Sequence, residues 1–171
     1  KDIIDLFNKG DVLVRNDTQV FPARLFAHKD KSDAKVEVFL LRELENDLWE
    51  AMVKPARKVR IGNKLIFEKN ISCDVIDNTV SGGRVLRFEY NVDSLYPFID
   101  KKGHSPLPPY IKRKSIPSDK DNYQTIYASE RGSVAAPTAG LHFTKGLLNK
   151  IEKKGVKIVY ITQHIGLGTF R

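Results

Sequence analysis

The chain has 171 residues, of which 41% are hydrophobic, with 29 Lys and Arg against 21 Asp and Glu. Its length allows one domain or two small ones, and a core of that size needs neither disulfides nor metal. The single Cys73 excludes a disulfide scaffold, and no apolar run approaches the roughly 18 residues of a membrane span. The first residues also lack the apolar region of a secretion signal. We therefore expect a soluble, cytoplasmic protein.

The net charge of +8 is unevenly distributed along the chain. Residues 1–85 carry 15 basic and 14 acidic side chains, whereas residues 86–171 carry 14 and 7. Such asymmetry is typical of proteins with a polyanionic partner, most often nucleic acid, although a basic surface that serves only solubility gives the same counts.

In chain order, residues 3–10 are predicted to end a helix, because apolar residues precede Gly10 at a helical spacing. Residues 11–14 form a short apolar strand, and the polar residues 15–18 follow it. Residues 21–90 then contain six short runs that alternate apolar and polar residues between turn-like segments, which predicts a small antiparallel barrel or sandwich. The six predicted strands are 21–29, 35–44, 47–54, 63–68, 71–77 and 84–90.

After Tyr90 the pattern changes. Residues 92–103 predict a short helix, and residues 105–121 contain four prolines and a basic triplet, which is typical of an exposed connector. Thr144 can cap a helix over 145–154, and residues 156–161 form a continuous apolar strand of the kind buried on both faces. We therefore predict an α/β fold with an inserted small antiparallel β-barrel: a discontinuous α/β domain from residues 1–20 and 91–171, and a barrel domain from residues 21–90.

Three polar segments fall at comparable places in this predicted fold. Residues 16–18 follow one strand, residues 162–169 follow another, and residues 133–144 lead into the start of a helix. Open α/β sheets bind ligands beyond the carboxyl ends of their strands, where helix N-termini also present free amides. We therefore expect the three segments to share one pocket. Gly166 and Gly168 lack the spacing of a nucleotide-binding motif. They allow either a tight turn or close approach of a ligand to the backbone.

The four histidines show no metal-ligand spacing, so we expect no metal site. His142 and His164 lie in two of the three segments, where either a structural role or proton transfer is open to them. Ser133 has no nucleophile-elbow motif around it, which argues against covalent catalysis. Arg24 and Arg131 could pair with a substrate carboxylate or an RNA phosphate, or with an ordinary surface partner.

Basic residues also cluster outside these segments. They lie at residues 54–64, in the pair 101–102 and in the triplet 112–114, with Pro55, Tyr110 and Ile111 interleaved. Aromatic and apolar surface among cations suits single-stranded RNA, although a solvated charged face is the commoner role of such clusters. The residues predicted to bind RNA are Lys54, Arg57, Lys58, Lys112, Arg113 and Lys114.

Several long segments resemble, in the same order, the S-adenosylmethionine:tRNA ribosyltransferase-isomerase family of queuosine biosynthesis. They are GDVLVRNDTQVFPARLF, DLWEAMVKPARKVRIG, SPLPPYIKRK, YQTIYASERGSVAAPTAGLHFT and TQHIGLGTFR. The similarity covers essentially the whole chain, but members of this family are about twice as long, so the chain resembles a fragment. The family fold, an α/β domain with an inserted β-barrel, agrees with the division predicted above.

The resemblance implies a tRNA-modifying enzyme. Family members transfer and isomerise the ribosyl moiety of S-adenosylmethionine onto 7-aminomethyl-7-deazaguanine at the wobble position of tRNA. The product is epoxyqueuosine, and adenine and methionine are released. The partners implied are therefore S-adenosylmethionine, which is consumed, and the tRNA anticodon loop. We expect a monomer.

Set against that chemistry, the titratable side chains of the three segments become candidates for catalysis. His142 is predicted to act as base or acid, His164 as its counterpart, and Asp17 to position the ribose or sulfonium. The residues predicted to bind substrate are Asn16, Thr18, Arg24, Arg131, Ser133, Thr138, Gly140, Gly166, Gly168 and Thr169. Two other functions stay open: a non-catalytic RNA-binding module, and a small-molecule hydrolase that uses His142 and Asp17.

Overall fold

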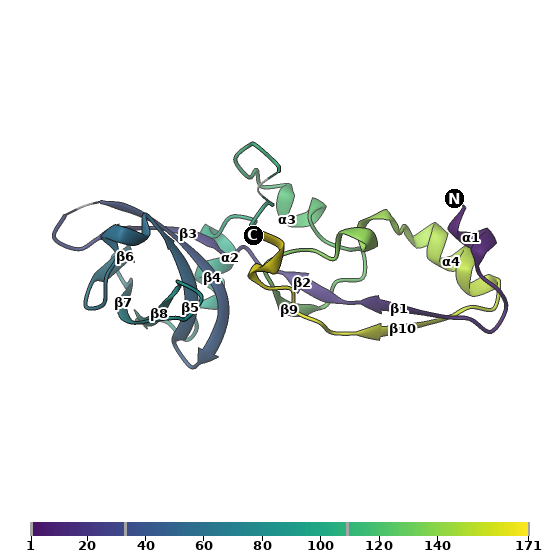
Figure 1. Cartoon of the computed structure of the whole chain (residues 1–171), viewed down its shortest axis with the longest axis horizontal. Coiled ribbons are helices and arrows are strands. Elements are labelled where there is room, and N and C mark those ends of the chain that lie inside the picture. The colour runs from purple at the N-terminus through teal and green to yellow at the C-terminus, as the bar shows by residue number, and fades with distance from the viewer. Residues whose placement is uncertain (1, 33, 109, 171) are drawn as a thin grey trace. The chain divides into compact units, whose positions relative to one another are not determined.

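The computed structural model describes residues 2–32, 34–108 and 110–170, without the side chains of Thr169 and Phe170. It divides into two compact units, one formed by Lys1–Val20 with Ser118–Arg171 and the other by Phe21–Pro117. Figure 1 shows the strands of each unit. The unit that contains the barrel extends to Pro117, whereas the sequence predicts that the barrel domain ends at residue 90. The domain boundary at residue 90 stays a prediction. No helix among the described residues is long and apolar enough to cross a membrane.

Six antiparallel strands close into a barrel in the order β3-β4-β5-β8-β7-β6. The strands are β3 (Arg24–Lys29), β4 (Lys35–Glu45), β5 (Leu48–Lys54), β6 (Lys64–Glu68), β7 (Ile71–Asn78) and β8 (Arg84–Tyr90). Each coincides with one of the six predicted strands, which confirms the inserted barrel. The fold is therefore α/β with an inserted small antiparallel β-barrel.

The barrel core consists of the inward-facing residues of each strand. Along β3, Leu25 and Ala27 are each 1% exposed, whereas Arg24, Phe26 and His28 face outward. Cys73 on β7 is buried in this core, and burial raises the pKa of its thiol, so the thiol stays protonated and unreactive. Period-two alternation thus sets the core and the outer surface along β3, whereas β4 buries four consecutive residues, 38–41.

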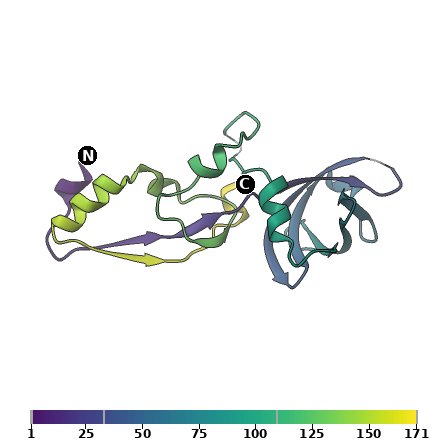
Figure 2. The same ribbon diagram turned by 180° about the vertical axis from the view of Figure 1, so that it is seen from behind.

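A helix follows the barrel, as predicted. Helix α2 (Tyr96–Lys102) is the teal helix beside the barrel strands in Figure 2. Its Phe98 packs against Phe67 of β6, with ring centroids 5.9 Å apart. Gly103 then lets the chain pass close to the start of β3, because a β-carbon at this position would lie 2.0 Å from the carbonyl oxygen of Pro22. The next residue, His104, pairs through its backbone with Arg24. The absence of a side chain at Gly103 therefore allows the connector to lie directly against the barrel.

The other unit contains two parallel strand pairs. Strand β1 (Val12–Asn16) pairs with β10 (Lys157–Ile161), and β2 (Thr18–Val20) pairs with β9 (Glu130–Ser133) (Figure 1). The helices of this unit are α1 (Ile3–Leu6), α3 (Asp119–Asn122) and α4 (Lys145–Lys153), with 3-10 turns η2 (Thr138–His142) and η3 (Leu167–Phe170). In the barrel unit, a further 3-10 turn, η1 (Ala56–Lys58), follows β5.

Helix α4 begins where its capping residue predicts. The hydroxyl of Thr144 accepts a hydrogen bond from the backbone N–H of Leu147 at 3.1 Å, and Leu148 and Ile151 are buried. The expectation that residues 156–161 would be buried on both faces is wrong, since Tyr160 and Ile161 are each 50% exposed. The reason is that β1 and β10 pair only with each other among the described strands.

The close approach at residue 103 predicts a specific loss of stability. Gly103→Ala forces a methyl group against two backbone oxygens, those of Pro22 and Ile99, which cannot move as a flexible side chain would. We expect the free energy of unfolding to fall by about 1–3 kcal/mol in urea denaturation. The matched control is Gly146→Ala in α4, where a β-carbon meets nothing within 4 Å and alanine favours the helix. Equal stability of the two variants would contradict the prediction.

Candidate active site

The carboxyl ends of β1 and β10 are fastened together by Asn16. Its side-chain N–H donates to the carbonyl of Gln163 at 2.8 Å, and its side-chain oxygen accepts from the N–H of Gln163 at 3.0 Å. The backbone N–H of Asp17 also donates to the carbonyl of Ile161. Two of the three polar segments predicted to meet, residues 16–18 and residues 162–169, therefore do so.

Asp17 lies at this junction and is half-buried. One carboxylate oxygen accepts a hydrogen bond from the hydroxyl of Thr162 at 2.7 Å, and no described residue bonds the other. Its carbonyl accepts the backbone N–H groups of Ser129 and Glu130, which brings the chain before β9 to the same place. The carboxylate is thus held on one side and open on the other, which suits the positioning of a cation or a hydroxyl group.

A chain of hydroxyl groups connects the same junction to His164. The hydroxyl oxygens of Thr18 and Ser133 lie 2.7 Å apart, and the Thr18 oxygen lies 2.8 Å from Nδ1 of His164. Thr18 and Ser133 are fully buried, whereas His164 is exposed. Ser133 also accepts the backbone N–H of Ile165 at 2.7 Å. The third polar segment therefore joins the other two at its first residue.

The direction of these hydrogen bonds follows from the need to satisfy buried groups. Because Ser133 already accepts from Ile165, its own proton has one acceptor among the described residues, the hydroxyl of Thr18. The proton of Thr18 then has two acceptors, Nδ1 of His164 at 2.8 Å and the carbonyl of Glu130 at 3.4 Å. Nδ1 of His164 can therefore accept from Thr18 when it carries no proton, or donate to Thr18 when it does.

This arrangement suits an imidazole that changes its protonation state. In either state the buried hydroxyls keep their partners, so protonation leaves no buried polar group unsatisfied. Nε2 of His164 has no hydrogen-bond partner among the described residues, which leaves it available to another molecule. Gly132 provides room for the ring, because a β-carbon there would lie 2.5–2.7 Å from three of its atoms.

Arg15 is a residue that sequence reasoning missed. Its guanidinium lies 4.1 Å from the ring centroid of Tyr127 and 4.6 Å from that of Tyr160, and one of its N–H groups donates to the Tyr160 hydroxyl. The side chain is 5% exposed, and its Nε and Nη1 have no acceptor among the described residues. The two rings offset part of the cost of burying this charge. Its place two residues after the inward-facing Leu13 was the available signal.

Gly140 packs against this cluster from the third segment. A β-carbon at Gly140 would lie 2.4 Å from the hydroxyl of Tyr127, so glycine allows η2 to lie directly on that ring. Burial raises the pKa of Tyr127, partly opposed by the charge of Arg15, and the phenol therefore stays protonated. His142, at the other end of η2, is exposed, and no hydrogen bond of the described residues joins it to Asp17 or His164.

The remaining predicted substrate-binding residues are distributed as follows. Arg131 is half-buried on β9 opposite Gln19, and Thr138 is exposed on η2. Gly166 and Gly168 are exposed, and a β-carbon at either meets nothing within 4 Å. The side chain of Thr169 lies outside the described residues. Arg24 lies in the barrel unit, ion-paired with Glu37 at 3.1 Å.

Five of the six predicted RNA-binding residues line two hollows of the barrel unit. Lys112, Arg113 and Lys114 line one of about 710 Å³ together with Arg24. Arg57 and Lys58 line another of about 470 Å³, whereas Lys54 is exposed at the end of β5 and lines neither. Among the described residues, no group of three or more His, Cys, Asp or Glu side chains could hold a metal ion.

An α/β unit with an inserted barrel, together with an exposed histidine bonded to a buried hydroxyl, defines the protein as one of two parts with a polar site at its strand ends. Comparison with known families identifies its family. A family model described as "Queuosine biosynthesis protein" matches residues 1–171. The chain belongs to this family.

Two curated relatives share a name. The chain is 53% identical over 172 residues to the S-adenosylmethionine:tRNA ribosyltransferase-isomerase of Chloroherpeton thalassium, covering 99% of this chain and 50% of the relative. It is 54% identical over 178 residues to that of Flavobacterium psychrophilum, covering 99% and 50%. A crystal structure of S-adenosylmethionine tRNA ribosyltransferase from Thermotoga maritima is 28% identical, with a TM-score of 0.42 over 96% of this chain and 44% of that one. The chain spans about half the length of the curated relatives it matches.

The hydroxyl chain makes a testable prediction about Thr18. Thr18→Val keeps the shape of the side chain but leaves the buried Ser133 hydroxyl without its acceptor, so we expect the free energy of unfolding to fall by about 1–3 kcal/mol. Thr18→Ser, the control, keeps the hydroxyl and should lose less. Urea denaturation measures both variants, and nitrogen NMR of the His164 ring reports the missing hydrogen bond. A valine variant as stable as the serine variant would refute this assignment of donors and acceptors.

Proposed function

We propose that the chain forms part of an S-adenosylmethionine:tRNA ribosyltransferase-isomerase. The reaction transfers and isomerises the ribosyl moiety of S-adenosylmethionine onto 7-aminomethyl-7-deazaguanine at the tRNA wobble position, which yields epoxyqueuosine, adenine and methionine. The observation that carries the proposal is the exposed imidazole of His164, bonded through Nδ1 to the buried hydroxyl of Thr18. The names of the relatives favour this enzyme over a non-catalytic RNA-binding module.

The chemistry needs one group that removes a proton and one that supplies a proton. The sulfonium acidifies the adjacent C5′–H, so a neutral imidazole can take this proton and leave an ylide. When the bond from C1′ to adenine breaks, its electron pair goes to adenine. A proton from a general acid stabilises the departing adenine. His164 is proposed for one of these steps through Nε2, and His142 for the other. His164 has the stronger support, because its ring is oriented by Thr18 and Gly132.

Asp17 is proposed to position the substrate. Its carboxylate is oriented by Thr162 through one oxygen, and the other oxygen can accept a ribose hydroxyl or face the sulfonium. The hydrogen bonds of Asp17 and His164 reach the same junction of β1, β2, β9 and β10, which supports a shared substrate. Enzymes accelerate reactions by holding the reacting groups in such fixed positions.

The glycines of the last segment support this placement. Neither packing among the described residues nor a left-handed backbone requires glycine at residues 166 and 168. Close approach of a substrate to the backbone is a reason that remains. Asn16, Thr18, Ser133, Thr138, Gly140 and Thr169 are proposed to shape the same site, with Arg131 as a partner for a carboxylate or phosphate.

The barrel unit is proposed to bind the tRNA anticodon loop. Its cations at residues 54, 57, 58 and 112–114 supply attraction to phosphate, which gives affinity and salt dependence rather than sequence choice. Arg24 belongs with them, since it lines the same hollow as the triplet 112–114. We also propose that the enzyme acts as a monomer in the cytoplasm.

The proposed reaction is tested by following adenine. The intact protein is incubated with S-adenosylmethionine and a tRNA that bears 7-aminomethyl-7-deazaguanine, and free adenine is measured by chromatography. We expect one adenine for each tRNA modified, and none with the same tRNA bearing guanine at the wobble position. A folded protein that binds the precursor tRNA but releases no adenine would overturn the proposed function.

The role of His164 is tested with His164→Asn. Asparagine can keep a polar atom near the place of Nδ1 and its bond to Thr18, but it has no counterpart of Nε2. We expect kcat for adenine release to fall about 10²- to 10⁴-fold with little change in the unfolding midpoint. His142→Ala is measured in parallel, and turnover within a few-fold of the parent would remove either residue from the proposed mechanism.

A further inference from the structure

The outer face of β3 presents a row of side chains that the barrel core does not use. Arg24, Phe26 and His28 alternate with the buried Leu25 and Ala27, and Phe26 is 55% exposed. A single exposed apolar side chain is ordinary on a protein surface. Phe26 differs because of the charges and the second ring that surround it.

Phe26 lines the hollow of about 710 Å³ that also contains the basic triplet. Its ring meets that of His104 edge-on, with centroids 5.5 Å apart and planes at 71°. Four cations line this hollow, and Glu37 is the carboxylate among its described lining residues. That carboxylate is already paired with Arg24 at 3.1 Å. The hollow therefore combines two aromatic rings with surplus positive charge, which suits an anionic ligand that has a flat apolar face.

The walls of this hollow are built from backbone as well as side chains. Arg24 and His104 exchange backbone hydrogen bonds of 3.2 and 2.9 Å, which hold the connector beside β3. The hydroxyl of Ser115 lies 3.4 Å from Nδ1 of His104, so the end of the basic triplet returns to the same ring. The arrangement is therefore part of the fold of the barrel unit.

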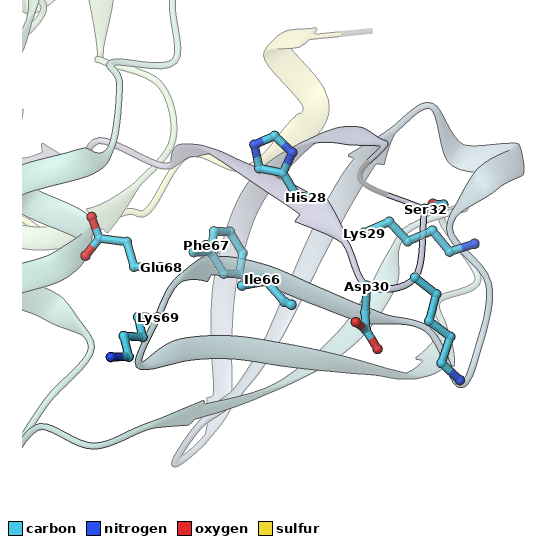
Figure 3. A pocket seen from close by; sticks show the side chains of 9 residues that line it. His28, Lys29, Asp30, Ser32, Ile66, Phe67, Glu68 and Lys69 are labelled. Atoms are coloured by element: carbon cyan, nitrogen blue, oxygen red, sulfur yellow. The ribbon is translucent and has the colours of Figure 1, made fainter.

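Two further hollows continue along β3. The next outward residue, His28, lines one of about 710 Å³ with Phe67 of β6, as Figure 3 shows. Three lysines and two carboxylates, Asp30 and Glu68, also line it, and Glu68 is paired with Lys102 of α2. Lys29 belongs to this hollow and also to the one of about 470 Å³, whose other cations are Arg57, Lys58 and Arg60 and whose described lining has no carboxylate. At about 3.3 Å per residue, the path from Arg24 to Lys29 covers roughly 16 Å.

We propose that the outer face of β3 binds a single-stranded segment of RNA, with one base stacked on Phe26 beside His104. Phosphates are held by Lys112 and Lys114 at one end of this path and by the cations around Lys29 at the other. Duplex RNA is disfavoured, because the faces of its bases are covered by their neighbours. That the RNA is a tRNA rests on the proposed function, whereas the stacking of a base on Phe26 is a separate claim.

The stacking claim is tested with fluorescein-labelled octauridylate and the chain itself, by fluorescence anisotropy at several salt concentrations. Phe26→Ala should weaken binding about tenfold without changing the salt dependence, since stacking releases no counterions. Phe26→Tyr should bind within about twofold of the parent. Leu44→Ala is the matched control, because Leu44 is a 41% exposed apolar residue on β4 outside the three hollows.

Heparin, a polyanion without bases, separates stacking from charge. Phe26→Ala should bind heparin as tightly as the parent does. The double variant Lys112→Gln/Lys114→Gln should bind both octauridylate and heparin more weakly than the parent. For each phosphate that a removed lysine had neutralised, the slope of log affinity against log salt for octauridylate should become shallower by about 0.7. The control for this pair is Lys101→Gln, an exposed lysine on α2.

The proposal is overturned if Phe26→Ala binds octauridylate within twofold of the parent. It is also overturned if Phe26→Ala weakens heparin binding as much as octauridylate binding, because the surface then recognises an anion without bases, such as an acidic protein. Adenine release by the intact protein separates the two levels of the argument. If adenine is released but Phe26→Ala does not change octauridylate binding, the stacking site alone is ruled out. Stacking on Phe26 without adenine release removes the proposed reaction and leaves the RNA surface in place.

Discussion

The buried hydroxyl of Thr18 is the interaction on which the candidate site depends. It meets Ser133, the first residue of a segment more than a hundred residues away, and His164 from the loop after β10. A buried hydroxyl without a partner costs more free energy than a typical hydrogen bond gains. Separation of Thr18 from Ser133 therefore leaves a buried hydroxyl without its partner. This requirement acts together with the backbone hydrogen bond from Val134 to Ile165 and the bonds of Asn16 to Gln163 to hold the loop after β10 in place.

Arg15 acts at the same junction through a different physical effect. Its guanidinium lies against the rings of both Tyr160 of β10 and Tyr127 of the loop before β9, and Tyr127 in turn contacts Gly140 of η2. A charge buried with few acceptors is costly, so the rings that compensate it cannot be moved independently. Thr18 and Arg15 together hold the strand ends rigidly while leaving the far edge of the His164 ring exposed. Such rigid support is what a proton-transferring side chain needs.

The sequence predicted some elements and missed others for identifiable reasons. The six barrel strands were predictable because Leu25, Ala27 and their counterparts recur at every second residue, and α4 because Thr144 precedes an amphipathic run. The β2–β9 pair was missed, since three- and four-residue strands of mixed polarity carry no period. The meeting of residues 16–18 with residues 162–169 followed from the parallel order of strands. The link through Ser133 did not, because hydrogen bonds between distant residues leave no local pattern.

The outer face of the barrel follows from the same alternation that builds its core. A strand that buries Leu25 and Ala27 must present Arg24, Phe26 and His28 outward, roughly 7 Å apart on a rigid backbone. Apart from Arg24 and Lys29 of β3, the cations that line the three hollows lie on connecting segments, such as residues 112–114 after the proline-rich stretch. Rigid rings and adaptable cations differ in what they contribute to binding. Stacking on a fixed ring requires a base in one place, whereas lysine side chains accept phosphate over a range of positions. In the proposed RNA surface, β3 therefore provides the placement of the ligand, and the connecting segments provide most of the attraction.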